Sequence, residues 1–321
     1  MSGKIEGHRR VGFRKSDYES YDYSQFWEDN KRLYEDRAER LALRRLLTGV
    51  DRDNKLFFDI GCGYGRLFNE YKDFGTIVLI DYSIKNLRSA KNKIETFLKN
   101  DPEKLSSIYF IAADAASLPV KSNCADVILT VRVIHHLDNP EKYFNEVARI
   151  LRVKGLYFLE FASKRNLKNI LRFTTGRMDT SPFNLIPSQI GETILNFHPK
   201  HIVNLLKRRN FTVKKLISVS NFRLSLLKKF PGTKTLIFLE KIYQKFFSFA
   251  LFGPSVFLKS VLSGPEPEGT AGNKKVVLED ILICTSCGKD SLFFDKNKIK
   301  CRNCGSIFIK ENGIYNFKKS V

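Results

Sequence analysis

One short segment limits what this chain can fold into more than any other. An apolar run, Leu56–Ile60, leads directly into a turn that has glycine at positions 61, 63 and 65. The run has the length and composition of a buried β-strand, and the residues after the turn have the pattern of a helix start. Bare backbone N–H groups in such a turn can approach a ligand closely, because glycine has no side chain. The segment predicts an α/β protein with a ligand site at this turn.

The spacing of the glycines argues against a dinucleotide-binding dehydrogenase. The dinucleotide fingerprint is G-x-G-x-x-G, and the position of its third glycine holds Arg66. A second apolar run, 76–80, ends at Asp81, twenty residues after Gly61. A carboxylate in that position can accept hydrogen bonds from two ribose hydroxyls. The two segments together indicate a ligand that contains a ribose.

The sequence D-I-G-C-G-Y-G-R at 59–66, followed by V-L-I-D-Y-S at 78–83, resembles motifs I and II of the class I S-adenosylmethionine (SAM) methyltransferases, in the type 11 subgroup. The resemblance covers roughly residues 30–262. It implies a Rossmann-like sheet of seven strands with helices on both faces, and SAM as the cofactor. It also implies a cofactor-binding set, which comprises Asp59, Gly61, Cys62, Gly63, Gly65, Asp81, Tyr82, Asp114, Ala115 and Thr130. In that set Asp114 and Ala115 match the pair that recognises adenine, although an Asp after a strand is more often a turn or helix cap.

The chain beyond Asp81 alternates short apolar runs with helix-spaced segments. Further strands are expected at 108–112, 127–131, 156–162, 212–220 and 255–261, and helices at 84–98, 140–151 and 199–209. This alternation predicts a parallel sheet covered on both faces, with ligands bound beyond the carboxyl ends of its strands. The resembling family inserts its last strand antiparallel, which periodicity alone does not show.

A helical segment is expected before the first strand, preceded by a flexible arm over 1–24. The resemblance implies that such a leading segment can close over the cofactor, which makes Tyr21, Tyr23 and Trp27 candidate lid residues. Packing against the edge of the sheet is the competing interpretation, and the one we favour.

Two histidines just past the fourth strand, His135 and His136, are the candidates for a catalytic base. Such a base is needed only if the acceptor must lose a proton early. Either histidine can instead cap the strand exit and pack against the cofactor, and His198 is a third candidate that can equally begin a helix.

The sequence Thr130-Val131-Arg132 replaces the motif of many adenine and glutamine amino-methyltransferases. A covalent cysteine mechanism lacks its nucleophile, which leaves an oxygen, nitrogen or activated carbon acceptor.

The positive charge is concentrated in one part of the chain. Of the formal net charge of +21, residues 163–262 carry +15, with 18 basic against 3 acidic side chains. A basic segment of this kind suggests RNA, and tRNA in particular, as the acceptor, with its phosphates contacting the lysines and arginines. Residues 236–252 are apolar around most of a helical wheel; we expect burial in the core or under a lid, with peripheral membrane contact as the minority alternative. A lipid, quinone-like or other small acceptor, and a non-catalytic SAM- or RNA-binding subunit, remain alternative functions.

Four cysteines near the end of the chain form two C-x-x-C pairs, Cys284 with Cys287 and Cys301 with Cys304, each followed by glycine. Thirteen residues separate the pairs, a spacing typical of a structural zinc ribbon rather than a disulfide framework. The pattern resembles the small zinc-ribbon activator subunit shared by several tRNA and translation-factor methyltransferases. We therefore expect a methyltransferase domain over 25–262, a linker over 263–280 rich in proline and glycine, and a Zn²⁺ ribbon over 281–321.

No apolar run in the sequence approaches the roughly 18 residues of a membrane span, and the first fifteen residues lack the apolar centre of a signal peptide. The paired thiols fit metal ligation in a reducing compartment. We expect a cytoplasmic protein.

Overall fold

The computed structural model describes Trp27 and residues 32–191, 194–223, 232–265 and 277–320. The expected arm at 1–24, with Tyr21 and Tyr23, and most of the expected linker lie outside these residues. Within the described ranges, no helix is both long enough and apolar enough to cross a membrane.

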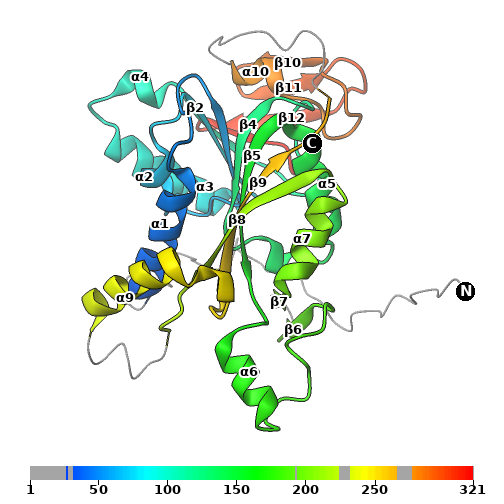
Figure 1. The fold of residues 1–321 in the computed structure, drawn as a ribbon. Helices are drawn as coiled ribbons and strands as arrows, with labels where there is room; N and C mark the ends of the chain where they lie inside the picture. The colour runs from blue at the N-terminus through cyan, green and yellow to red at the C-terminus, as the bar shows by residue number, and fades with distance from the viewer. Residues whose placement is uncertain (1–26, 28–31, 192–193, 224–231, 266–276, 321) are drawn as a thin grey trace, which may run out of the picture.

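One sheet of eleven strands forms the centre of the molecule, in the order β10-β11-β12-β13-β3-β2-β1-β4-β5-β9-β8 (Figure 1). Seven of these strands correspond to the predicted methyltransferase sheet: β1 (Leu56–Ile60), β2 (Thr76–Asp81), β3 (Ile108–Ala112), β4 (Ala125–Thr130), β5 (Leu151–Ala162), β8 (Phe211–Val219) and β9 (Ser255–Leu262). Strands β3, β2, β1, β4 and β5 run parallel to one another, and β9 inserts antiparallel between β5 and β8. The Rossmann-like fold class is confirmed.

Helices cover both faces of this sheet. One layer contains α1 (Leu33–Leu47), the short α2 (Phe68–Tyr71) and α3 (Ile84–Phe97), whose apolar side chains share a core with β1 and β2. The other contains α5 (Pro140–Ile150) and α7 (Pro199–Lys207). The strands between them are buried on both faces, as β1 and β2 show by their unbroken burial. Burial on both faces explains why these strands are almost continuously apolar in the sequence.

Smaller elements complete the part of the chain before the ribbon. They are α4 (Pro102–Leu105), the 3-10 helix η2 (Ile134–His136), α6 (Leu167–Thr174), the hairpin β6 (Ser188–Ile190) with β7 (Ile194–Asn196), α9 (Thr233–Phe246) and the 3-10 helix η3 (Ser248–Ala250). Helix α6 follows the carboxyl end of β5, and both α6 and α9 lie at the lower end of the molecule in Figure 1.

The sheet is larger than seven strands because the ribbon joins it. The ribbon consists of α10 (Leu278–Ile281), β10 (Leu292–Asp295), β11 (Lys298–Cys301), β12 (Ile307–Glu311) and β13 (Ile314–Asn316). Strand β13 pairs in parallel with β3, Ile314 opposite Phe110, and Phe317 N–H donates to Ala112 O at 2.8 Å. The ribbon therefore continues the backbone hydrogen bonding of the central sheet.

The expected burial of residues 236–252 is not found in helix α9 and the residues after it, where most of the large apolar side chains are exposed. The buried residues of α9 are the apolar Leu236 and the polar Glu240 and Gln244. The Glu240 carboxylate accepts from the N–H groups of Ser220 and Asn221 and from the Tyr34 hydroxyl. Gln244 donates to Ala38 O on α1. Buried backbone and hydroxyl groups need such partners, so the carboxylate and amide turn inward, and most of the phenylalanines turn outward. The prediction of core burial was wrong for this reason.

Candidate functional site

The glycine-rich turn is anchored to the neighbouring strand. The N–H groups of Gly61 and Cys62 both donate to Ile80 O, at 2.7 and 3.1 Å. Gly61 has a φ of +79°, and a Cβ there would lie 2.1 Å from Val133 Cγ2, so no other residue fits without displacing the loop after β4. The turn therefore brings the ends of β1, β2 and β4 together.

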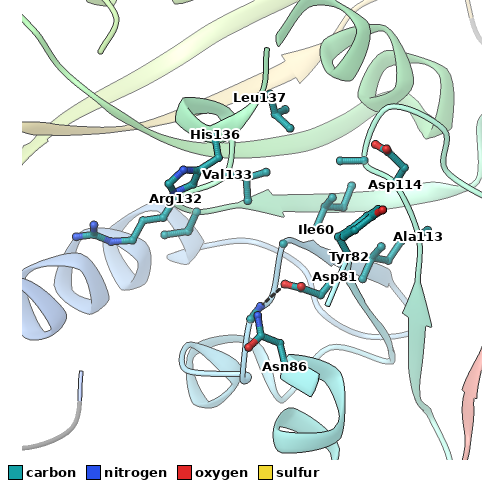
Figure 2. Close-up of a pocket in the computed structure, with 15 residues that line it drawn as sticks. Ile60, Asp81, Tyr82, Asn86, Ala113, Asp114, Arg132, Val133, His136 and Leu137 are labelled. Carbon is teal, nitrogen blue, oxygen red and sulfur yellow. Dashed lines mark hydrogen bonds between the residues drawn. The ribbon is translucent and has the colours of Figure 1, made fainter. Parts of the chain in front are cut away.

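Asp81 at the end of β2 holds the turn from the other side. Its Oδ2 accepts from Gly63 N–H at 2.8 Å (Figure 2). Its Oδ1 accepts from Ser83 N–H at 2.8 Å. The side chain is half-buried. Each carboxylate oxygen can accept more than one hydrogen bond, so Asp81 can hold the turn and still accept from a ligand.

A pocket opens at this point, beyond the carboxyl ends of β1 to β4 (Figure 2). It is lined by Ile60, Gly61, Gly63, Ile80, Asp81, Tyr82, Asn86, Ala113, Asp114, Ala115, Val131, Arg132, Val133, His136 and Leu137. Six of the ten predicted cofactor-binding residues, and one of the two predicted catalytic histidines, are in this lining. Ligands of open α/β sheets bind at this edge.

Asp114 and Ala115 form one end of the pocket. Asp114 also stabilises its own turn, because its Oδ1 accepts from Ala116 N–H at 2.9 Å. The turn-cap interpretation is therefore confirmed; Asp114 also lines the pocket, and its recognition of adenine stays a prediction. Tyr82 is 42% exposed, and Lys318 from the ribbon lies with its Nζ 4.6 Å from the Tyr82 ring centroid. The ribbon thus reaches a pocket residue through a cation–π contact.

A smaller hollow at the turn is lined by Asp59, Cys62 and Arg66 together with Gly61 and Gly63. Burial raises the pKa of Asp59 to about 7, even though Tyr71 donates a hydrogen bond to its carboxylate. Burial also raises the pKa of the Cys62 thiol well above its usual range. Cys62 is therefore a neutral packing group here rather than a nucleophile.

Two further residues of the predicted cofactor-binding set line neither the pocket nor this hollow. Thr130 is fully buried, and its hydroxyl is hydrogen-bonded to the Tyr143 hydroxyl on α5. Gly65 has a φ of +70°, and a Cβ there would lie 3.3 Å from Ala90 Cβ, so it allows α3 to pack against the turn.

The two neighbouring histidines differ sharply in position. His136 lines the pocket, whereas His135 is buried outside the lining with its ring centroid 4.1 Å from that of His136. Burial, with the charges of His136 and Arg132, holds the pKa of His135 well below its usual range. His198 begins α7, where its Nδ1 accepts from Lys200 N–H at 3.1 Å. Of the three, only His136 faces the pocket.

A charged cluster beside the pocket was not predicted. Arg132 has a φ of +61°, and its guanidinium points away from the other lining residues (Figure 2) to bond the fully buried Glu39 of α1. Arg66 bonds the second Glu39 oxygen at 2.6 Å, and the Trp27 ring lies over both guanidiniums, at 3.8 Å from Arg66 and 4.8 Å from Arg132. An acidic residue in a leading helix carries no sequence signal that would identify this partner.

The four ribbon cysteines meet at one point. Their sulfur atoms all lie within 4.8 Å of one another, with Cys284 and Cys304 at 3.7 Å and Cys287 and Cys301 at 3.6 Å. Four thiolates at about 2.3 Å around one tetrahedral Zn²⁺ would lie about 3.8 Å apart. The donor set and the spacing therefore fit one such ion.

Comparison with known proteins concerns the part of the chain that forms the pocket. Residues 58–159 match the family described as a methyltransferase domain. An uncharacterized protein of Methanocaldococcus jannaschii is 35% identical over 112 residues, 35% of this chain and 43% of that protein. The ubiquinone biosynthesis O-methyltransferase of Pelagibacter ubique is 27% identical over 164 residues, 51% of this chain and 64% of that one. The chain therefore spans less than two thirds of each of these relatives.

A similar fold occurs among solved structures, and one example is described here. It is a chain of the complex between the Haloferax volcanii Trm112 methyltransferase activator and a methyltransferase, with a TM-score of 0.51 and 15% identity. The similarity covers 77% of this chain and all of that one.

Proposed function

We propose that this chain, which carries a methyltransferase domain over residues 58–159, transfers the methyl group of SAM to an acceptor. The observation that carries the proposal is the pocket at the carboxyl ends of β1 to β4, where the glycine turn, Asp81 and Asp114 converge. SAM supplies an electrophilic methyl group on a sulfonium centre. The work of the protein is then to orient both reactants and exclude water.

Each part of the pocket has a task in this proposal. Asp81 accepts from the ribose hydroxyls, and Asp114 accepts from the adenine amine while Ala115 N–H donates to the ring. The turn at Gly61 and Gly63 leaves room for the amino acid part of SAM. His136 removes a proton where the acceptor has one to lose.

The acceptor is proposed to be an oxygen, nitrogen or activated carbon atom. The excess of +15 over residues 163–262 supports an acceptor on RNA. The 27% identity to a ubiquinone biosynthesis O-methyltransferase supports the alternative of a lipid or quinone-like acceptor. The outward apolar face of α9 is a second observation in favour of that alternative.

We further propose that the ribbon binds one Zn²⁺ and acts as a stabilising subunit within the same chain. Support comes from the four converging sulfurs and from β13, which occupies the edge of β3. The complex named above contains a separate methyltransferase activator. Here β13 and Lys318 would serve such a role from within the chain.

Labelled SAM incubated with the pure protein and separated RNA, lipid and protein fractions tests the proposal. Label should move into one fraction, and boiled protein should transfer none. A chain that binds S-adenosylhomocysteine but labels no fraction would be a SAM-binding subunit instead. A chain that binds neither SAM nor its product would refute the site assignment itself.

A further inference from the structure

The outward face of α9 and η3 presents an unusual concentration of large apolar side chains to solvent. Phe238 is 61% exposed, Phe246 58% and Phe249 81%, while Glu240 on the inward face is fully buried. Residues 238, 242 and 246 are four apart and form one stripe along the helix. Contiguous exposed apolar surface of this kind marks an interaction site.

The apolar surface continues onto α6. Leu167 N–H donates to Phe252 O at 2.9 Å, and Arg165 Nη1 donates to Ala250 O at 3.1 Å, so the start of α6 lies against the loop after η3. Leu167 and Leu171 on α6 are 51% and 55% exposed. We call the exposed apolar residues of α6, α9, η3 and the residues that adjoin η3 together the apolar face. It comprises Leu167, Leu171, Phe238, Leu239, Ile242, Phe246, Phe247, Phe249 and Phe252.

Basic side chains border the apolar face. On α9, at 100° per residue, Lys234, Lys241 and Lys245 fall along one side of the stripe, and all three are exposed. On α6, Lys168 and Arg172 are exposed beside the leucines. Among the described residues of 163–191 and 232–252, Asp179 is the one exposed acidic side chain, since Glu240 is buried.

We propose that the apolar face docks on the surface of a membrane that contains anionic phospholipids. An apolar stripe with lysines along its margin places the phenylalanines at the acyl boundary and the ammonium groups among the lipid phosphates. A second copy of the chain would bring two surfaces of the same strong positive charge together. Single-stranded RNA stacks on aromatic rings, but it would leave the aliphatic Leu239 and Ile242 without an apolar environment.

The location of the face fits such docking. Helix α6 follows the carboxyl end of β5, the edge of the sheet at which the pocket opens. The ribbon lies at the opposite end of the molecule (Figure 1). A bilayer can therefore cover α6 and α9 without displacing the ribbon.

Vesicle co-sedimentation of the full chain tests the proposal. We expect partition onto phosphatidylcholine vesicles with about 30% phosphatidylglycerol at about 0.1 M salt, and weaker partition without the anionic lipid or at higher salt. The variant F238S/F246S/F249S should lose at least tenfold in partition, and K234E/K241E/K245E should lose a similar factor. The matched controls, F293S and K296E/K298E/K300E on the ribbon, should partition like the native chain.

A tryptophan probe distinguishes insertion from simple electrostatic adsorption. Anionic vesicles should blue-shift the emission of F249W and leave that of F293W unchanged, each measured against the native background of Trp27. The proposal is overturned if the native chain does not partition, or if the phenylalanine variant partitions equally well. It is also overturned if these phenylalanines instead support a dimer or RNA binding. S-adenosylhomocysteine affinity is measured on the same variants. It tests the methyltransferase proposal independently of membrane binding.

Discussion

Glu39 on α1 and Arg132 after β4 are 93 positions apart, yet Arg132 Nε donates to Glu39 Oε1 at 3.0 Å. Burial alone would raise the pKa of Glu39, but the charges of Arg132 and Arg66 hold it below its usual range. Arg132 N–H also donates to Glu160 Oε2 on β5 at 2.8 Å. This one arginine ties the leading helix, the pocket loop and the central sheet together.

Arg132→Ala should lower the free energy of unfolding by about 3 kcal/mol, because it leaves the buried Glu39 carboxylate with one cation instead of two. Denaturant unfolding at neutral pH measures the change. Arg152→Ala is the matched control, since its pair with Asp126 is partly exposed and should contribute less than about 1 kcal/mol. Equal losses in the two variants would contradict the role given to the buried cluster.

Asp59 should make the stability of the protein depend on pH. Its pKa is about 7 in the folded chain and about 4 when unfolded. A carboxyl group shifted upward contributes stability that is complete below about pH 4 and is lost as the pH rises through about 7. Asp59→Asn should flatten this part of the pH profile by up to about 4 kcal/mol, and the surface variant Asp73→Asn serves as the control. Unfolding midpoints from pH 4 to about 8 provide the measurement.

Asp81→Ala should weaken S-adenosylhomocysteine binding at least tenfold by calorimetry. It removes the proposed acceptor for the ribose and also leaves Gly63 N–H and Ser83 N–H without their present partner. Asp81→Asn separates these effects, because its amide oxygen can keep one of the two bonds. Unchanged affinity in both variants would place the cofactor elsewhere.

His136→Gln should reduce the methylation rate at least a hundredfold if His136 acts as the general base, and should leave S-adenosylhomocysteine affinity within about twofold. The assay is label transfer to the fraction identified in the first experiment. His201→Gln, outside the pocket, serves as the control. A full rate in the His136 variant would mean that the acceptor reacts without losing a proton early.

Removing the metal should destabilise more than the ribbon. One Zn²⁺ per chain is expected by metal analysis, and Cys284→Ser with Cys301→Ser should abolish it, whereas Cys124→Ala should not. Because β13 pairs with β3, hydrogen exchange should accelerate in residues 108–112 as well as in the ribbon. Acceleration confined to the ribbon would mean that β3 does not depend on it.

The sequence predicted the parts of the fold that local pattern controls. The strands around Leu56–Ile60, the glycine turn and Asp81 were all identifiable, because burial and turn geometry restrict residue type there. Arg132 was not, because its bond to Glu39 depends on a helix far away in sequence. The burial of residues 236–252 was wrongly predicted for a related reason. Their hydrophobicity indicates a helix, but the face that turns inward depends on buried partners such as Tyr34, which are distant in sequence.

The pairing of β13 with β3 has a consequence for any attempt to shorten this protein. A sheet edge left bare offers its unpaired N–H and C=O groups to other chains, and natural proteins usually shield such edges. Here β13, the last strand among the described residues, shields the edge of β3. A fragment that ends at residue 265 would expose the flank of β3, and we expect it to aggregate rather than behave as a minimal catalytic unit.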